Sequence, residues 1–219
     1  MDTTVSGVGV LDKSVLILRS LEPRPLALGE LVAATGLSRP TAHRLAVALE
    51  AHGMVRRDSQ GRFALGLGLV TLGRAASDGV PLVEAARPAL ARLRDETGES
   101  AQIYVRQGDV RVCVASLESL HGLRTIVRLG AALPLDRGSA GRVLRGDPAV
   151  HDRGFVESVE EREAGVASVS APVLGAGGEV RAAVGVSGPI ERTSRAPGER
   201  YGEAVVRAAR AAEAAAGYR

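Results

Sequence analysis

The chain has a single cysteine and no long apolar run, and each absence excludes a class of protein. Because Cys113 is alone, neither a disulfide nor a cysteine-based zinc finger can form within one chain. It lies in the apolar stretch 110–115, where we expect a buried structural thiol rather than a redox sensor. No stretch reaches the roughly 18 apolar residues of a membrane helix, and the N-terminus does not resemble a signal peptide. We therefore expect a cytoplasmic protein with no membrane partner.

The sequence also lacks a recognisable set of reacting residues. Ser139 follows Gly138 directly in the segment RGSAG, so the G-x-S-x-G spacing of a hydrolase nucleophile is absent. The four histidines are scattered, without an H-x-x-x-H pair, and no G-K-[ST] phosphate-binding motif occurs. We therefore expect no catalysis, no cofactor and no metal. A small-molecule enzyme is the rival hypothesis from another functional class.

What the chain does contain is enough material for two modest domains. Its 219 residues carry a net charge of +3 with a pI near 9.6, which suits a nucleic-acid partner without proving one. We predict a DNA-binding domain at 1–66, a linker helix at 67–79 and a second domain at 80–219. The boundary is placed near Gly79, where the helical pattern is interrupted.

Residues 28–66 follow the order of two helices, a tight turn and a basic hairpin. An apolar repeat at helical spacing stops at Gly36, a residue that accepts the left-handed backbone at a helix end. Ser38 can cap a second helix with its hydroxyl, and Pro40 suits the first turn of that helix. We therefore predict a helix-turn-helix whose second helix begins at Arg39.

The second helix is predicted to expose a cationic N-terminal half. Its predicted buried residues are Ala42, Leu45, Ala48, Leu49 and His52. Arg39, His43 and Val47 point away from that face, and Arg44 lies on the opposite flank. Thr41 is near the buried edge, but its hydroxyl can reach outward. This pattern is typical of a recognition helix that enters the major groove, where arginines bind guanine or grip phosphates.

A basic hairpin is predicted next, from runs at 54–57 and 62–65 separated by a turn with glycine. Its arginines would meet phosphates or a minor groove. The residues predicted to contact DNA are Ser38, Arg39, Thr41, His43, Arg44, Arg56, Arg57 and Arg62. The alternative is that the hairpin arginines are merely solvated, because helix pairs with a glycine turn also occur in proteins that never touch DNA.

Outside this region the sequence predicts further helices and a sheet. Helices are predicted at 8–21, 67–76, 81–97, 139–144 and 198–216, with a loop at 133–138. The apolar period changes to two at strands 101–106, 110–118, 124–129, 167–174 and 180–187. The acidic residues Glu157, Glu160, Glu161 and Glu163 are predicted to lie in a solvated loop. Strands flanked by helices at both ends predict an α+β domain built on an antiparallel sheet.

Several segments resemble the IclR family of bacterial transcription regulators. These are TGLSRPTAHRLAVALEAHGMV in the first domain, and GESAQIYVRQGD, EREAGVASVSAPV and VRAAVGVSGPIER in the second. The segments are similar in particular to the actinobacterial NdgR-like subgroup, which is associated with amino-acid metabolism and antibiotic production. The resemblance implies a winged helix-turn-helix joined by a linker helix to a GAF-like effector domain. It places Arg39, Thr41 and Arg44 at DNA-contacting positions.

The same resemblance implies a homodimer or a dimer of dimers on a palindromic operator, with the helix at 8–21 and the linker helix supplying dimer contacts. Two departures from the family pattern stand out. Ala27 occupies a position where relatives usually have a Ser or Thr cap, typically worth ~1 kcal/mol. The segment after the helix at 139–144 is shortened to 145–153, whereas relatives carry a longer one that helps to wall the effector pocket.

The effector pocket implied by the resemblance would lie between the sheet and residues 130–141. The residues predicted to contact an effector are Gly130, Ser139, Ala140, Ser168 and Ser170. For each serine the alternative is a hydrogen bond to nearby backbone. We predict a sequence-specific DNA-binding regulator, repressor-like and ligand-responsive, that controls amino-acid or secondary metabolism. A ligand-insensitive dimeric DNA-binding module with a degenerate sensor domain is the alternative.

Overall fold

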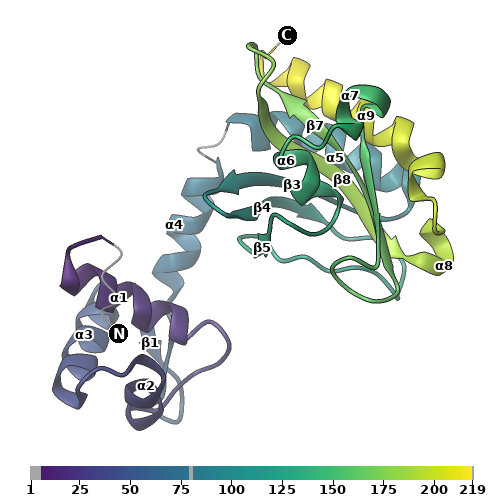
Figure 1. Ribbon diagram of the computed structural model, residues 1–219. Helices are drawn as coiled ribbons and strands as arrows, with labels where there is room; N and C mark the ends of the chain where they lie inside the picture. The colour runs from purple at the N-terminus through teal and green to yellow at the C-terminus, as the bar shows by residue number, and fades with distance from the viewer. Residues whose placement is uncertain (1–5, 79–80, 219) are drawn as a thin grey trace. The chain divides into compact units, whose positions relative to one another are not determined.

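The computed structural model describes residues 6–78 and 81–218, and the chain divides into two compact units, Met1–Ser77 and Asp78–Arg219 (Figure 1). The first part of the chain contains α1 (Gly9–Ser20), α2 (Leu28–Thr35), α3 (Arg39–Ala51), β1 (Val55–Arg57), β2 (Phe63–Leu65) and α4 (Leu67–Asp78). The second contains α5 (Pro81–Thr97), β3 (Ser100–Gln107), β4 (Val110–Leu117), β5 (Ala132–Pro134), α6 (Ser139–Leu144), α7 (Ala149–Arg153), β6 (Val156–Val159), β7 (Val166–Leu174), β8 (Val180–Pro189), α8 (Ile190–Thr193) and α9 (Pro197–Ala215). The boundary predicted at Gly79 lies outside the described residues.

The N-terminal unit is a helix-turn-helix followed by a wing, as predicted. Gly36 ends α2 in the left-handed conformation with φ 67°, and α3 begins at Arg39, directly after the extended N-cap residue Ser38. The wing is the antiparallel hairpin of β1 and β2. The hydrophobic core of the N-terminal unit consists of Ile17, Leu21, Leu26, Leu31, Leu45, Ala46, Leu49, Val55 and Phe63. These apolar residues come from α1, α2, α3, the wing and the connection between α1 and α2, so one core fixes the direction of α3 relative to α2.

The wing is closed by a contact that the sequence did not indicate. Leu26 and Phe63 exchange both backbone hydrogen bonds at 2.8 Å, which adds a third, one-residue strand beside β2. This bridge ties the chain just before α2 to the hairpin. The hairpin is therefore fixed to the helices by hydrogen bonds as well as by apolar packing.

The buried face of α3 differs from the predicted one. Ala48 and His52 are exposed, and Ala46 is fully buried. The stripe that packs into the core therefore runs along Ala42, Leu45, Ala46 and Leu49, which are spaced at i, i+3, i+4 and i+7. The prediction centred the face on Leu45, but contacts with α1, α2 and β1 rotate it toward Ala46. Helix periodicity alone cannot specify this rotation, because alanine fits either side of the boundary.

The helix caps also differ in detail from the prediction. Ser38 has the extended backbone of an N-cap, but its hydroxyl donates to Thr41 Oγ1 at 2.9 Å instead of accepting a backbone N–H. At the start of α2 the cap is provided by the side chain of the third helical residue and not by the N-cap residue itself. The backbone N–H of Ala27 donates to the carboxylate of Glu30 at 2.8 Å, which is half of a capping box. Glu30 therefore replaces part of the stabilisation that an N-cap serine or threonine would provide.

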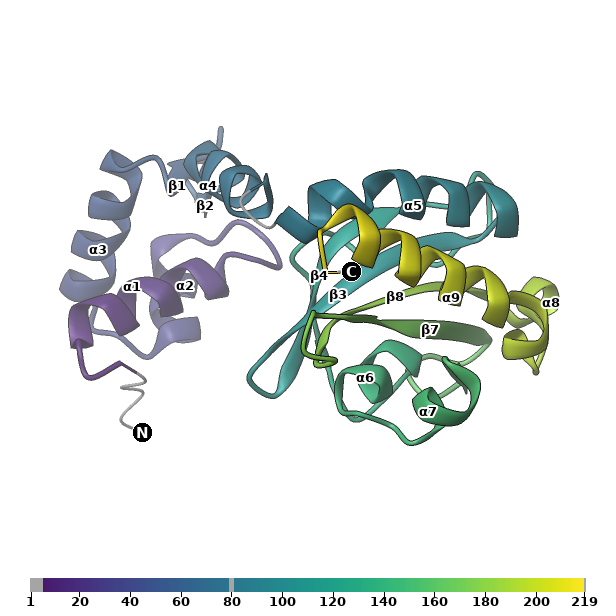
Figure 2. The ribbon, with the colours of Figure 1, turned by 90° about the horizontal axis from the view of Figure 1, so that it is seen from above.

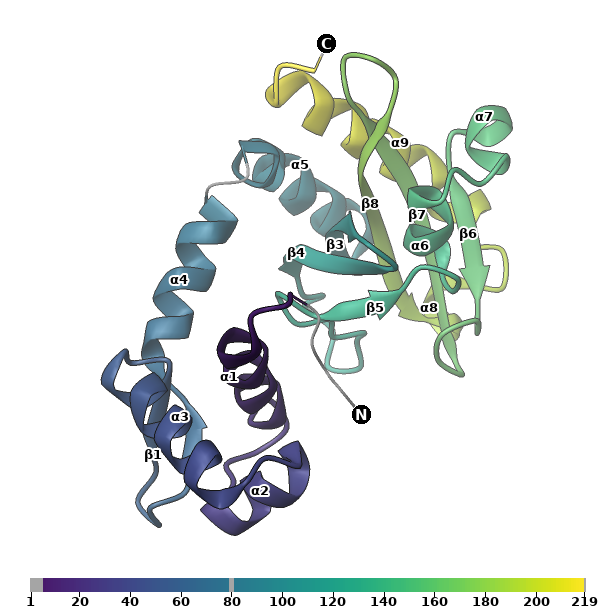
Figure 3. The same cartoon turned by 60° about the vertical axis from the view of Figure 1, so that its left-hand side comes forward.

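The C-terminal unit is built on a six-stranded antiparallel sheet in the order β5-β4-β3-β8-β7-β6. Figure 2 shows α5 and α9 on one face of this sheet and α6 and α7 on the other. The strands at its two ends run in clearly different directions, as Figure 3 shows, so the sheet is strongly twisted. The predicted α+β architecture with an antiparallel sheet is confirmed.

Alternation along the strands separates two cores. Val169, Ala171 and Val173 of β7 pack with α5 and α9, whereas Ser168 and Ser170 point to the face covered by α6. The second core, under α6, contains Tyr104, Cys113 and Val143 among others. The thiol of Cys113 is buried there, as predicted, and burial raises its pKa to about 12. A thiol with that pKa is unreactive at neutral pH.

The predicted strand at 124–129 is wrong. Thr125 and Val127 are buried and Ile126 is exposed, so the alternation that suggested a strand is present. Among the described residues the segment nevertheless joins no ladder, and the strand that pairs with residues 110–112 of β4 is instead β5, which overlaps the start of the predicted loop at 133–138. Burial of alternate side chains is therefore compatible with extended backbone outside a sheet.

The sequence also missed β6, α7 and α8. Glu157, predicted to lie in a solvated loop, is on β6, where its carboxylate accepts the backbone N–H of Gly198 at 2.8 Å. The segment 145–153, predicted to be shortened, is partly helical, since the five-residue α7 forms its end and the edge strand β6 follows it. The short helix predicted at 139–144 is confirmed as α6.

Candidate nucleic-acid interface and effector cavity

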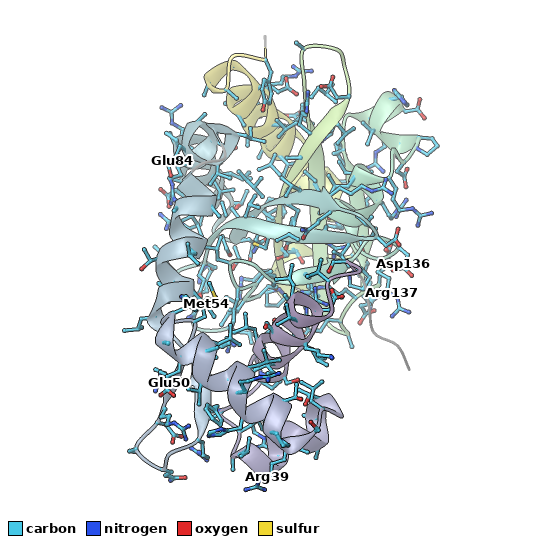
Figure 4. The ribbon with its side chains drawn as sticks, turned by 90° about the vertical axis from the view of Figure 1, so that its left-hand side faces the viewer. Arg39, Glu50, Met54, Glu84, Asp136 and Arg137 are labelled. Atoms are coloured by element: carbon cyan, nitrogen blue, oxygen red, sulfur yellow. The ribbon has the colours of Figure 1, made fainter. Side chains whose placement is uncertain are left out.

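The N-terminal half of α3 exposes its basic residues. Arg39, His43 and Arg44 are all exposed, and none of them forms a hydrogen bond or an ion pair within the described part of the chain. Figure 4 shows the side chain of Arg39 at the end of α3, pointing away from its domain. Ser38 is also exposed, and Thr41 is half-buried and bonded to it. Three side chains with hydrogen-bond donors are thus free to meet a ligand outside the protein.

The wing arginines are not equivalent. Arg56 is exposed and has no partner among the residues that the structure describes. Arg57 pairs with Glu50 of α3 at 3.3 Å, and its guanidinium lies 4.2 Å from the centroid of the Phe63 ring. Arg62 pairs with Asp58 at 2.7 Å. Among the described residues, Arg56 alone of the three wing arginines has no hydrogen bond or ion pair, so it is available to a ligand, whereas Arg57 and Arg62 also stabilise the hairpin.

The second candidate site is a cavity of about 30 Å³ between α6, the sheet and residues 158–163. Its walls are formed by Gln102, Tyr104, Arg111, Gly138, Ser139, Ala140, Ser158, Glu161, Arg162, Glu163, Val166, Ser168, Ser170, Val186 and Ser187. Four of the five residues predicted to contact an effector meet here. The fifth, Gly130, lies in an exposed turn where its N–H donates to Cys113 O, and it does not line the cavity.

The three predicted serines form one hydroxyl cluster. Ser139 Oγ lies 2.9 Å from Ser168 Oγ and 2.8 Å from Ser170 Oγ. The serines therefore bond to one another across the cavity wall, whereas the alternative reading expected bonds to nearby backbone. Each hydroxyl keeps acceptor or donor capacity for a further partner.

Arg111 is a cavity residue that the sequence analysis missed. It is only 3% exposed, and its Nη1 donates to Arg137 O at 2.6 Å and to Pro134 O. Its guanidinium also lies 5.5 Å from the centroid of the Tyr104 ring. The available signal was an arginine at the start of the apolar stretch 110–115, a position where a charge is costly.

Burial lowers the pKa of Arg111, although an arginine remains charged at neutral pH. No carboxylate forms an ion pair with it in the described part of the chain, and its Nε has no hydrogen-bond partner. The nearby Glu161 is engaged elsewhere, by the N–H of Gly138 at 2.8 Å and by Arg142 at 3.2 Å. Asp136 and Arg137 belong to the loop whose carbonyls accept from Arg111, and their side chains are exposed on its outer side (Figure 4). Among the described residues, Arg111 is therefore held by backbone carbonyls and not by a direct ion pair.

Comparison with known proteins identifies both units. Residues 10–59 match the family described as IclR helix-turn-helix domain. Residues 74–146 and 148–214 match the family described as Bacterial transcriptional regulator IclR C-terminal. The chain belongs to the IclR family. The two parts of the C-terminal match meet at Asp147, between α6 and α7 of this IclR protein.

Two curated relatives illustrate the relationship of this IclR protein to others. The HTH-type transcriptional regulator KipR of Bacillus subtilis is 28% identical over 162 residues, which are 73% of this chain but only 65% of KipR. The HTH-type transcriptional regulator BhcR of Paracoccus denitrificans is 28% identical over 239 residues, covering 93% of this chain and 86% of BhcR. Both relatives are transcriptional regulators by name. Their names support the regulator hypothesis over the enzyme.

A solved structure has the same fold as this IclR protein. It is an IclR homolog complexed with 4-hydroxybenzoate from Microbacterium hydrocarbonoxydans, with a TM-score of 0.81 and 19% sequence identity over 94% of this chain and 98% of that one.

Within residues 6–78 and 81–218 we find neither a helix able to cross a bilayer nor a cluster of metal-binding side chains.

Proposed function

We propose that this IclR-family protein is a homodimeric, effector-responsive transcription regulator that reads a palindromic operator with α3 and the wing. The observation that carries the proposal is the set of basic side chains on α3, Arg39, His43 and Arg44, which are exposed and unpaired in the described residues. A recognition helix uses its N-terminal turns to reach base edges in the major groove. Arg56 of the wing would add a phosphate or minor-groove contact. A DNA partner of this kind implies a cytoplasmic location.

Dimerisation is supported by apolar side chains that no part of the described chain covers. Val10 and Leu11 of α1 are 62% and 54% exposed, and Leu67 and Val70 of α4 are 76% and 66% exposed. Isolated apolar residues on a surface are ordinary, but runs of them on two helices favour a protein interface. Paired heads are also what reading two half-sites requires. A dimer of dimers would need further contacts.

For the effector, we propose the cavity lined by Ser139, Ala140, Ser168 and Ser170 as the binding site. The fold-level likeness to a homolog complexed with 4-hydroxybenzoate supports a small organic ligand. A ligand can regulate only through unequal affinity for two arrangements of the paired heads, which the linker helix α4 would couple to the effector domain. The similarity to the NdgR-like subgroup supports a role in amino-acid or secondary metabolism.

One observation favours a second candidate, a ligand-insensitive DNA-binding module. The cavity of about 30 Å³ has room for about two water molecules, because each needs roughly 10–15 Å³. The segment that would widen its wall is the shortened one after α6. A thermal-shift screen of the full chain with amino acids and small organic acids separates the two candidates, because a ligand that binds the folded state raises the melting temperature and a ligand-insensitive module shows no rise.

The proposed function is tested by salt-dependent gel shifts with the DNA upstream of the protein's own gene. Arg44→Ala is expected to weaken binding by about 1–3 kcal/mol if the side chain contacts a base, and to lower the salt slope if it contacts a phosphate. Arg210→Ala is the control, because Arg210 is an exposed arginine of α9 in the other unit. Unchanged affinity and salt slope in Arg39→Ala, Arg44→Ala and Arg56→Ala together would overturn the proposal.

A further inference from the structure

We infer that Val47 of α3 reads a thymine in the major groove by packing against the C5-methyl group of that base. The inference rests on the proposed function and adds to it a residue that determines which base is preferred. It starts from the burial of the large apolar residues of α3, a helix that the structure describes throughout. Leu45 and Leu49 are 7% and 8% exposed, whereas Val47 is 40% exposed. The core of the N-terminal unit therefore leaves Val47 uncovered.

Val47 shares the outward face of α3 with two basic residues. At about 100° per residue, it lies about 40° from His43 and about 60° from Arg44 around the helix axis. The outward stripe runs through Pro40, Arg44, Val47 and Ala51, all of which are exposed. It lies on the side of α3 opposite the stripe that packs into the core. A ligand that approaches the basic residues therefore also meets Val47.

The spacing of the outward residues is that of a helix that reads bases. Pro40, His43, Arg44 and Val47 stand at i, i+3, i+4 and i+7. Side chains at this spacing contact base edges in the major groove when a homeodomain binds DNA. Val47 follows Arg44 by about 4.5 Å along the helix axis, and successive bases of a strand are about 3.4 Å apart. Val47 can therefore meet a base pair next to the position of Arg44.

The chemistry of the side chain selects thymine among the bases. Val47 ends in two methyl groups and has no hydrogen-bonding atom, and the C5-methyl of thymine is the apolar group at the base edges of the major groove. Packing the two together removes apolar surface from water on both sides. At a G·C pair, the same valine would cover donors and acceptors without bonding to them, which costs free energy. Val47 therefore favours thymine and disfavours a G·C pair at its position.

DNA suits this face of α3 better than a protein partner does. Arg39, His43 and Arg44 are exposed and have no hydrogen bond or ion pair within the described part of the chain, so the face attracts a partner rich in negative charge. Val47 is also the single large apolar side chain on this face, whereas protein interfaces are marked by larger apolar patches. A duplex offers both the phosphates and the thymine methyl in one groove.

The test removes the methyl group of thymine and nothing else. Duplexes are first selected from a random library with the full chain, and the preferred half-site is read from the bound fraction. Each thymine of that half-site is then replaced in turn by deoxyuridine, and gel shifts measure the Kd. Replacement at one position is expected to raise the Kd about fourfold for each half-site changed. A half-site without thymine, or a Kd that no replacement changes, overturns the inference and shows that Val47 is merely exposed.

A variant assigns the methyl contact to Val47. Val47→Ala is expected to raise the Kd of the thymine duplex by a similar factor and to bind the thymine and deoxyuridine duplexes equally. It should fold, because the side chain is exposed and alanine has the higher helix propensity. Leu123→Ala is the control, since Leu123 is a 69% exposed apolar residue of the other unit, and it should keep the fourfold preference. A preference that is undiminished in Val47→Ala overturns the assignment.

Failure of the inference differs from failure of the proposed function. Selection that enriches no sequence would overturn the proposed function and the inference with it. Enrichment of a half-site whose thymine methyl groups make no difference would overturn the inference alone. Selection repeated with Val47→Ala is expected to lose the thymine at the assigned position and to keep the rest of the half-site. An unchanged thymine preference in that selection would contradict a role for Val47.

Discussion

The carboxylate of Glu99 and the guanidinium of Arg192 form a two-pronged ion pair, with Oε1 2.7 Å from Nε and Oε2 2.9 Å from Nη2. Glu99 is 1% exposed, and the arginine also donates to the carbonyl of Leu123 at 2.8 Å. The hydrogen bonds to Glu99 raise the pKa of Arg192. This pair joins the chain before β3 to α8 and to the coil after β4, which are distant in sequence.

Replacement of Arg192 by alanine is expected to lower the free energy of unfolding by about 3 kcal/mol, because it leaves a buried carboxylate without its cation. Urea unfolding measures the loss. The matched control is Arg195→Ala, whose partner Glu160 is at the surface, with an expected change within about 0.5 kcal/mol. Equal losses in the two variants would contradict a special role for the buried pair.

Two glycine substitutions should have opposite effects on stability. Gly141→Ala places a methyl group 2.5 Å from the carbonyl oxygen of Leu135, so overpacking is expected to cost about 1–3 kcal/mol. In the linker helix α4, the added methyl group of Gly73→Ala meets no described atom within 4 Å, so the substitution should stabilise that helix by about 0.5–1 kcal/mol. Thermal unfolding of both variants measures the difference. A stabilised Gly141→Ala would show that the space beside Arg111 is not filled as described.

The cap of α2 predicts a dependence of stability on pH. The N–H of Ala27, followed by Arg24, lowers the pKa of Glu30 below its ordinary value of 4.5. Since the folded state favours the carboxylate, its stabilising contribution is present above the ordinary pKa and is lost as the pH falls through the lowered value. The stability difference between the wild-type protein and Glu30→Gln should therefore shrink as the pH falls from about 6 to about 3. Urea titrations at several pH values measure it, and a difference that grows on acidification would contradict the cap.

The proposed dimer predicts that a charged substitution on α4 weakens dimerisation. Val70 is 66% exposed, and Val70→Glu should shift the protein toward monomer at micromolar concentration, because a charge in an apolar interface must be desolvated. Thr71→Glu is the control, since the neighbouring residue is also exposed but polar. Sedimentation velocity measures the fractions of monomer and dimer in each variant. A Val70→Glu protein as dimeric as the wild type would remove α4 from the interface.

Local sequence signals were sufficient for much of the fold. Gly36 and Pro40 marked the turn and the start of α3, and alternation located most strands of the large sheet. The same signals failed at residues 124–129, where alternate burial occurs without a ladder. Whether an extended segment becomes a strand depends on backbone hydrogen bonds to a sheet edge, and here β5 forms them with residues 110–112 of β4. Such bonds join separate segments of the chain, so periodicity within one segment cannot reveal them.

The amino-acid sequence by itself determined the order of the elements, the exposed basic half of α3 and the family to which the chain belongs, because helix periodicity, caps and turn residues act over a few neighbouring positions. Only the tertiary structure decided which arginines are free and which are held, and it brought Arg111 of β4 beside serines from α6 and β7. The physical reason is that burial and pairing of a charge depend on groups contributed by distant segments. A guanidinium looks the same in the sequence whether it meets a carboxylate, a carbonyl or an empty cavity.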